Sequence, residues 1–200
     1  MEKMDDSALV EQIQRGDQQA FTVLMERWQT RIHRFAFRFF ADVDEASEIT
    51  QKTFIKVYQK VDTLDKPGKF SSWIYRVANN LCLDELKRAG RRKSSPLDAS
   101  TMSRLRRASW VEQMETSETP AQKLETKELG EVLQKALLTL PDEQRVVIIL
   151  KEYEGMKFRE IAEILEEPEN TVKSRMYYGL KSLRRVLKKW NIQNEYLNHD

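Results

Sequence analysis

Hydroxyl, amine and guanidinium groups gather near the C-terminal end of the chain, in a segment whose apolar spacing predicts a helix. The group consists of Thr171, Lys173, Ser174, Arg175, Tyr178 and Lys181, and no acid occurs between residues 170 and 189. Lysine and arginine donate hydrogen bonds to guanine edges or to phosphates, and hydroxyl groups suit phosphates. A helix that carries these groups toward its N-terminal half is typical of proteins that read the major groove of duplex DNA.

A second helix must precede this one and set its angle. Phe158, Ile161 and Leu165 are spaced to line one face of a short helix over about Lys157–Glu166. Pro168 ends it, because the residue before a proline is pushed out of the helical region. The next helix, about Asn170–Trp190, is expected to begin at a cap on Asn170 or Thr171, and its expected buried residues are Val172, Met176, Leu180, Leu183 and Leu187. A plain helical hairpin has the same pattern, but the basic, acid-free second helix favours a helix-turn-helix.

A further polar group lies in the first half of the chain, on a helix predicted from about Ser71 to Ala89. The side expected to pack carries Trp73, Val77 and Leu81, and the side expected to be exposed carries Ser72, Tyr75, Arg76, Asn79 and Asn80. Bases from Arg88 to Lys93 follow. Aromatic and amide groups beside bases are typical of surfaces that hold unstacked single-stranded nucleic acid, although this signal is weak by itself.

The charge distribution supports contact with a polyanion at two places. The chain of 200 residues has a formal net charge of only +2, but two basic stretches, residues 70–93 and 170–189, flank a connector with acids at Glu112, Glu115, Glu118, Glu125, Glu128 and Glu131. Two basic surfaces would bind one polyanion at two positions. The alternative, that each run only solvates a helix face, stays open for either run alone.

Catalytic chemistry has few candidates. His33 and His199 are far apart in the chain, Cys82 is a lone cysteine expected to be a buried structural thiol, and no metal-ligand spacing or phosphate-binding glycine loop occurs. We therefore expect no catalytic residue, no metal and no cofactor. The N-terminus is charged, and no apolar run reaches the roughly 18 residues that a membrane-spanning helix needs. A cytoplasmic protein without membrane insertion is expected.

The predicted fold is all-α, with two small helical domains joined by a flexible linker and a helix-turn-helix in the C-terminal domain. Six glycines and five prolines are too few for a protein of many tight β-turns. Serines and prolines interrupt the apolar periodicity after residue 93, which places the domains at 1–93 and 123–200 and the linker at 94–122. The first core is predicted from the stripe Phe21, Leu24, Trp28, Ile32, Phe35 and Phe39.

Four motifs then appear in a recognisable order: Gly16–Phe21, Asp44–Phe54, Phe70–Leu81, and Leu140–Arg145 followed by the helix-turn-helix. Over nearly its whole length the chain resembles the extracytoplasmic-function (ECF, group IV) sigma factors of the sigma-70 family. The resemblance implies a promoter-specificity subunit of RNA polymerase with a region 2-like domain at 1–93 and a region 4-like domain at 123–200. The implied partners are core polymerase (its β′ clamp and β flap), promoter DNA and a candidate anti-sigma factor, and the free protein is expected to be a monomer.

The resemblance also assigns residues to each contact. The polymerase contact falls on Glu48, Gln51, Lys52 and Lys56. The minus-ten DNA contact falls on Ser72, Trp73, Tyr75, Arg76, Asn79, Asn80 and Arg88, with Asn80 where the family captures a flipped base. The minus-thirty-five contact falls on Thr171, Lys173, Ser174, Arg175, Tyr178 and Lys181. Two positions depart from the family pattern, since Lys52 stands where an acid is common and Asn170 where glycine is common.

Two other functions compete with this one. A stand-alone helix-turn-helix regulator would need a dimer interface or an effector pocket, and it leaves the segments around Gln51 and Asn80 unexplained. An enzyme is rejected for want of a catalytic group of residues. For Trp73, packing in the core is a simpler role than DNA contact.

Overall fold

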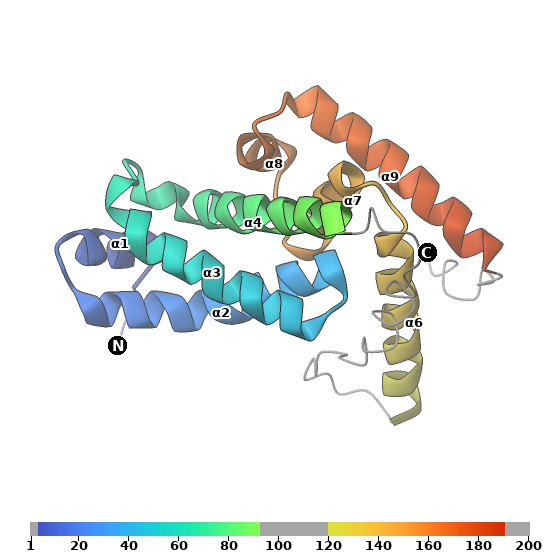
Figure 1. Ribbon diagram of the computed structural model, residues 1–200, viewed down its shortest axis with the longest axis horizontal. Helices are drawn as coiled ribbons and strands as arrows, with labels where there is room; N and C mark the ends of the chain where they lie inside the picture. Colours follow the sequence, from blue (N-terminus) through green and yellow to red (C-terminus); the bar gives the residue numbers. More distant parts are fainter. Residues whose placement is uncertain (1–3, 93–119, 191–200) are drawn as a thin grey trace.

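The computed structural model describes residues 4–92 and 120–190, which form helices and, within those ranges, no strand. The N-terminal module (residues 4–92) consists of α1 (Asp6–Gln14), α2 (Gln18–Phe40), α3 (Val43–Lys60) and α4 (Phe70–Arg92), with short 3₁₀ turns at Val61–Thr63 and Pro67–Lys69. The C-terminal module (residues 120–190) consists of α6 (Pro120–Leu138), α7 (Asp142–Ile148) with a π-helical turn at Ile149–Tyr153, α8 (Phe158–Leu165) and α9 (Glu169–Lys189) (Figure 1). The predicted all-α fold is confirmed.

Aspartates at the helix starts fix where α2 and α3 begin. The Asp17 carboxylate accepts hydrogen bonds from the backbone amides of Gln19 and Ala20, and the Asp42 carboxylate accepts them from Asp44 and Glu45. These bonds satisfy amide groups that have no partner inside the helix. Only Ala41 and Asp42 separate the two helices, which pack side by side as an antiparallel pair (Figure 1).

The apolar stripe of α2 forms the centre of the N-terminal module. Five of its six predicted residues are buried, Leu24, Trp28, Ile32, Phe35 and Phe39, whereas Phe21 is only partly buried. The predicted packing side of α4 is only partly right, because Trp73 and Leu81 pack against the core but are not at its centre. The buried residues of α4 are Phe70, Ile74, Tyr75, Ala78, Asn79 and Cys82, whereas Trp73, Val77 and Leu81 are partly buried.

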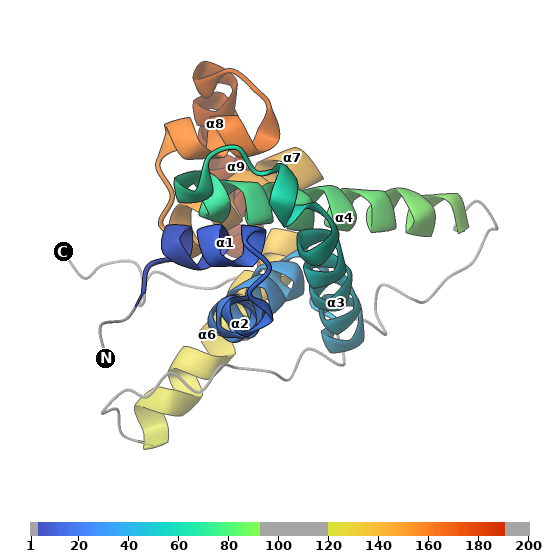
Figure 2. The ribbon, with the colours of Figure 1, turned by 90° about the vertical axis from the view of Figure 1, so that its left-hand side faces the viewer.

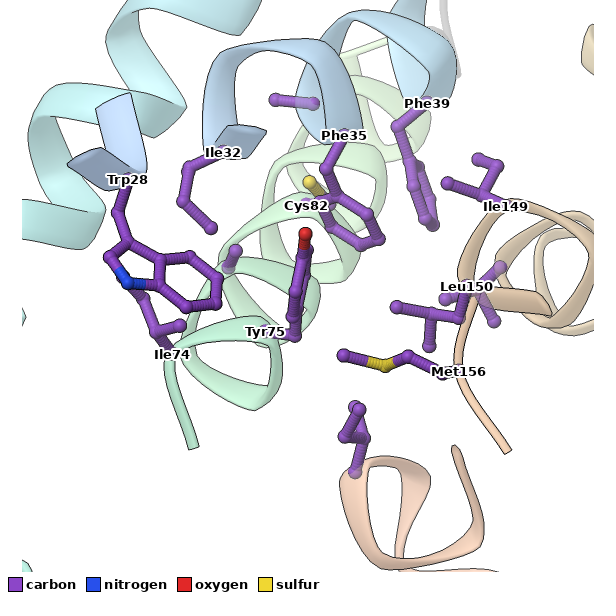
Figure 3. Packing of buried hydrophobic residues seen from close by; sticks show 14 of the residues in the cluster. Trp28, Ile32, Phe35, Phe39, Ile74, Tyr75, Cys82, Ile149, Leu150 and Met156 are labelled. Atoms are coloured by element: carbon purple, nitrogen blue, oxygen red, sulfur yellow. The ribbon is translucent and has the colours of Figure 1, made fainter. Parts of the chain in front are cut away.

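The two modules share one apolar core. Leu150 and Met156 of the C-terminal module point toward Tyr75 and Phe35, and Ile149 lies beside Phe39 (Figure 3). The views in Figures 1 and 2 both place α8 next to α4. The sequence predicted modules connected by a linker and did not predict this direct packing. The predicted linker, residues 94–122, lies outside the described residues except for 120–122, which begin α6.

Polar contacts complete this interface at the C-terminal end of α2. The buried Arg145 guanidinium donates to the Phe39 carbonyl oxygen at 2.8 Å and also to the Leu137 and Leu140 carbonyls, and Gln134 donates to the Arg38 carbonyl at 3.0 Å. The last carbonyls of a helix have no partner within it. Here the C-terminal module supplies the partners, and Arg145 also places a cation at the negative end of the α2 dipole.

Candidate nucleic-acid interface

The helix-turn-helix is built from α8, a tight turn and α9. Glu166 takes the left-handed backbone conformation at the end of α8 (φ 55°), and the Glu167 amide donates to the Ala162 carbonyl. Pro168 then stands at the N-cap of α9, which begins at Glu169. The predicted cap at Asn170 or Thr171 is therefore wrong, because the helix starts earlier and has no side-chain cap.

The inner side of α9 packs closely on α7. Val172 and Met176 are buried as predicted, and Leu183 and Leu187 are partly buried. Leu180, predicted to be buried, is 44% exposed, and the neighbouring Gly179 is buried instead. A Cβ atom on Gly179 would lie 2.9 Å from Ile148 Cδ1 and 3.3 Å from Gln144 Cβ. The glycine thus permits an approach of the two helices that a leucine at its position would prevent.

The outer side of α9 faces solvent with most of its predicted DNA contacts. Lys173, Ser174, Tyr178 and Lys181 are exposed, and Thr171 and Arg175 are partly buried. Tyr177, which is not among the predicted contacts, is 64% exposed. Lys173 pairs with Glu169 at 2.6 Å and Arg175 with Glu167 at 2.9 Å. Glu167, between α8 and α9, and Glu169, at the start of α9, therefore orient two basic side chains of this face.

The predicted minus-ten residues of α4 fall on different sides of the helix. Tyr75 and Asn79, predicted to be exposed, are buried, and Arg76 is partly buried. The Tyr75 hydroxyl donates to the Glu154 carboxylate, and Arg76 donates to the Glu163 carbonyl of α8. The Tyr75 hydroxyl and Arg76 thus contact the C-terminal module, while the Tyr75 ring packs against Trp28 and Phe35 of α2.

The covered groups show the cost of this burial. Burial, and then the nearby charge of Glu154, raise the pKa of Tyr75, and burial raises the pKa of Glu154 although its hydrogen bond from Tyr75 and nearby arginines act in the opposite direction. The Asn79 Oδ1 atom is buried with no hydrogen-bond partner among the described residues. An unpaired buried acceptor costs roughly 1–3 kcal/mol.

The other predicted minus-ten residues lie away from this interface. Asn80 and Arg88 are exposed, with Arg88 3.5 Å from the Glu85 carboxylate, and Ser72 is partly buried. The Trp73 ring lies 6.0 Å from the Phe70 ring and is partly buried. Asn80 is therefore accessible in this arrangement, and Trp73 combines a packing contact with partial exposure.

The predicted polymerase-binding residues of α3 also lie on different sides of their helix. Gln51 lines a cavity of about 620 Å³ between α2 and α3, beside Ile55 and Tyr58, which are 50% and 60% exposed. Lys52 instead turns toward α4 and pairs with Glu48 at 2.5 Å and with Glu85 at 3.7 Å. Lys56 is partly buried. Ile55 and Tyr58 were not predicted to belong to this contact. The signal in the sequence was two large apolar side chains three residues apart, outside the predicted buried side of the helix.

The one described histidine, His33, has its Nε2 atom 3.4 Å from the exposed Ser47 Oγ. No set of three potential metal ligands occurs within 4–92 and 120–190, and no helix there is long and apolar enough to cross a membrane. Cys82 is fully buried, and this burial raises its pKa. The side chain packs as a small apolar group, as the sequence predicted.

Comparison with known proteins relates the chain to one family. Residues 24–92 match the model of sigma-70 region 2, and residues 130–183 match that of sigma-70 region 4. The ECF RNA polymerase sigma factor SigW of Bacillus subtilis (strain 168) is 34% identical over 182 residues, which cover 90% of this chain and 95% of SigW. The ECF RNA polymerase sigma-E factor of Escherichia coli (strain K12) is 31% identical, covering 91% of this chain and 94% of that protein.

The chain belongs to the ECF RNA polymerase sigma factors. Solved structures agree on the fold. CnrH in complex with the cytosolic domain of CnrY aligns with a TM-score of 0.63 at 22% identity, covering 92% of this sigma factor and 97% of that chain. The sigma factor RpoE in complex with the anti-sigma factor NepR from Bartonella quintana aligns with a TM-score of 0.65 at 20% identity, covering 84% and 96%. The family predicted from the four motifs is thereby confirmed.

Proposed function

We propose that this ECF sigma factor directs core RNA polymerase to specific promoters and helps to open them, by binding and without a catalytic step of its own. The observation that carries the proposal is the presence of sigma-70 regions 2 and 4 in one chain, at nearly the full length of SigW and sigma-E. A stand-alone regulator is not favoured, because it would have no use for region 2.

For the upstream promoter element we assign the outer side of α9. Lys173, Ser174, Tyr178 and Lys181 are exposed together there, and the Arg175 side chain lies at the edge of the same surface. A helix fits the major groove of duplex DNA, and its basic and hydroxyl groups can donate to base edges and phosphates. This assignment gives the 123–200 region the reading of the minus-thirty-five element.

For the minus-ten element we assign α4. Asn80 is exposed and can hold a flipped base, with Ser72, Trp73 and Arg88 as neighbouring contacts. Arg76 and the hydroxyl group of Tyr75 join them only when the C-terminal module no longer contacts them. Stacking and pocket contacts can then offset the cost of unstacking, which is a few kcal/mol per base.

For core polymerase we assign the cavity between α2 and α3. Gln51, Ile55 and Tyr58 give it a polar group beside two exposed apolar side chains, the composition expected where a partner helix docks. Glu48 and Lys52 form the rim on the side of α4, and the partly buried Lys56 is assigned to the same contact. A protein that acts on core polymerase would work in the cytoplasm.

An anti-sigma factor is proposed as a further partner. Of two structures with the same fold, one holds the sigma factor RpoE bound to the anti-sigma factor NepR, and the other holds CnrH bound to the cytosolic domain of CnrY. We expect this sigma factor to be a monomer when it is bound to neither polymerase nor such a partner.

Run-off transcription from a library of promoters, using core polymerase with and without the protein, tests the proposed function. Transcripts that depend on the protein and share a two-part upstream sequence would establish it and define its specificity. A protein that fires no promoter yet binds a duplex site alone is a stand-alone regulator. The preparation must first be shown to be free of a bound inhibitor.

A further inference from the structure

Asn170 lies in the first turn of α9, on the outer side that is assigned to duplex DNA. Its side chain is exposed, and it makes no hydrogen bond to another residue within 4–92 and 120–190. Positions 170, 174, 177 and 181 follow one another at spacings of four, three and four, so that they share one side of the helix. Ser174, Tyr177 and Lys181 are exposed as well. Asn170 therefore extends the DNA-facing side of α9 toward its N-terminal end.

The backbone gives no reason for an asparagine at this position. Asparagine is favoured where the chain takes the left-handed conformation and where its side chain caps the start of a helix. In this chain the left-handed conformation falls on Glu166, and Pro168 stands at the N-cap of α9. Inside a helix asparagine is less favourable than alanine. Asn170 thus weakens its helix slightly without shaping the turn, which points to a contact outside the protein as its role.

Acids hold the basic side chains next to Asn170. Lys173 pairs with Glu169 at 2.6 Å, and Arg175 pairs with Glu167 at 2.9 Å. Either basic side chain must exchange its carboxylate for a DNA partner, whereas the Asn170 amide can meet the edge of a base with no ion pair broken. The amide is also neutral, so it gains little from the phosphates that attract every basic group alike. A gain in binding from Asn170 therefore depends on which DNA base it meets.

An asparagine amide presents a donor group and an acceptor side by side. In the major groove adenine offers the complementary pair, the N7 acceptor and the N6 amine donor, so that two hydrogen bonds form at once. Guanine offers two acceptors, cytosine offers a donor, and thymine offers an acceptor beside a methyl group, so each of these bases leaves part of the amide unpaired. The chemistry of the side chain therefore selects adenine.

We propose that Asn170 reads an adenine in the major groove of the upstream promoter element and sets the base preference of this sigma factor at that position. The proposal rests on the proposed function, because it deepens the assignment of α9 to the minus-thirty-five element. Basic groups such as Lys181 hold the helix on the phosphates, and Asn170 discriminates between base pairs. Loss of the amide should therefore change the sequence preference and leave the salt dependence of binding unaltered.

The test is run-off transcription by core polymerase with the full chain, from promoters in which each base pair of the upstream element is changed singly. Asn170→Ala keeps a residue compatible with the helix, and we expect it to lower the preference for adenine at one position by about tenfold and to leave the other positions unchanged. Asn170→Asp has acceptors and no donor when ionised, so the preference at the same position should move toward cytosine, whose N4 amine donates. Arg184→Ala is the control and should alter the preference at no position, because it changes an exposed side chain of the same helix that is assigned to no contact.

Binding of the holoenzyme to the promoter at several salt concentrations supplies a second readout. Lys181→Ala should lower the slope of log affinity against log salt by about one, because one phosphate contact is lost, whereas Asn170→Ala should not change it. Activity of both Asn170 variants on a promoter with a scrambled upstream element shows that they are folded and bind polymerase. Unchanged base preference in both variants would overturn the proposal, and so would an equal loss at every position or a fall in the salt slope. A wild-type protein that fires no promoter would instead refute the proposed function.

Discussion

The two helices assigned to DNA differ in their accessibility. The outer side of α9 is open to solvent along Lys173, Ser174 and Tyr178, whereas α8 and the turn after α7 cover the Tyr75 side of α4. Closure thus leaves a duplex-reading surface available and hides part of a single-strand surface. With these assignments the difference predicts an order of events, in which α9 binds duplex DNA before the modules separate and α4 makes full contact with an opened strand only afterwards.

The largest expected effect is on the covered side of this comparison. Arg145→Ala removes the donor to the carbonyls of Phe39, Leu137 and Leu140, which stay buried. Because an unsatisfied buried group costs about 1–3 kcal/mol, we expect the free energy of unfolding to fall by about 3 kcal/mol. Urea unfolding measures it. Arg159→Ala, which changes a side chain 85% exposed, is the control and should stay within about 0.5 kcal/mol. Similar losses in the two variants would show that the interface is held by other contacts.

The exposed side of α4 carries Asn80, whereas the neighbouring Asn79 is buried. Asn80→Ala should slow promoter melting by about tenfold or more, because a base contact is worth about 1–3 kcal/mol. A fluorescent base in the minus-ten element reports melting, and gel shift reports the closed promoter complex, which should change less. Asp84→Ala is the matched control, since Asp84 is exposed one helical turn further along α4 and is assigned to no contact. If both variants slowed melting equally, the assignment of base capture to Asn80 would be wrong.

On the open side, Lys173→Ala should lower transcription from promoters with an intact upstream element by up to about tenfold, the cost of one good base or phosphate contact. Transcription from promoters whose upstream element is scrambled should hardly change, and polymerase binding should be preserved. Lys188→Ala alters an exposed lysine at the other end of α9 and controls for charge. Loss of polymerase binding in Lys173→Ala would contradict the assignment of α9 to DNA.

The smallest expected effect compares the inner side of α9 with an uncrowded helix. Gly179→Ala must displace the buried Ile148 side chain, so we expect about 1 kcal/mol of destabilisation despite the better helix propensity of alanine. Gly130→Ala in α6 meets no atom within 4 Å and should stabilise by about 0.5–1 kcal/mol. Thermal unfolding measures both. Opposite signs support the close packing of α7 on α9, whereas two stabilised variants would refute it.

Much of the fold was predictable because local signals agree with it. Aspartate caps mark the starts of α2 and α3, and the α2 stripe has a single buried side. Which residues of α4 are most deeply buried was mispredicted in part, because both modules cover that helix. Its apolar residues therefore spread around a wide arc, and their spacing does not mark the most buried position. Leu180 was wrongly predicted to be buried for another reason. Hydrophobicity favours burial of a leucine, but α7 and α9 approach so closely that only a glycine, Gly179, fits between them.

The residues of the candidate sites were predictable only where exposure depends on the periodicity of a single helix. The exposed residues of α9 follow from helical periodicity. The contacts of Tyr75, Arg76 and Arg145 with the other module do not, because a tyrosine, an arginine or a glutamate that meets a partner distant in sequence looks like any solvated residue. Charged groups that satisfy one another across an interface leave no trace in hydrophobic patterning.

The end of α2 makes module separation observable at a single turn. Arg145 and Gln134 hold its last carbonyls, and in the same turn the Ala41 amide donates to the Phe37 carbonyl at 2.7 Å. When the C-terminal module departs, this turn loses both donors and becomes free to fray. The rate of hydrogen–deuterium exchange at the Ala41 amide therefore reports how often the modules separate, and it can be measured in the intact protein without an attached label.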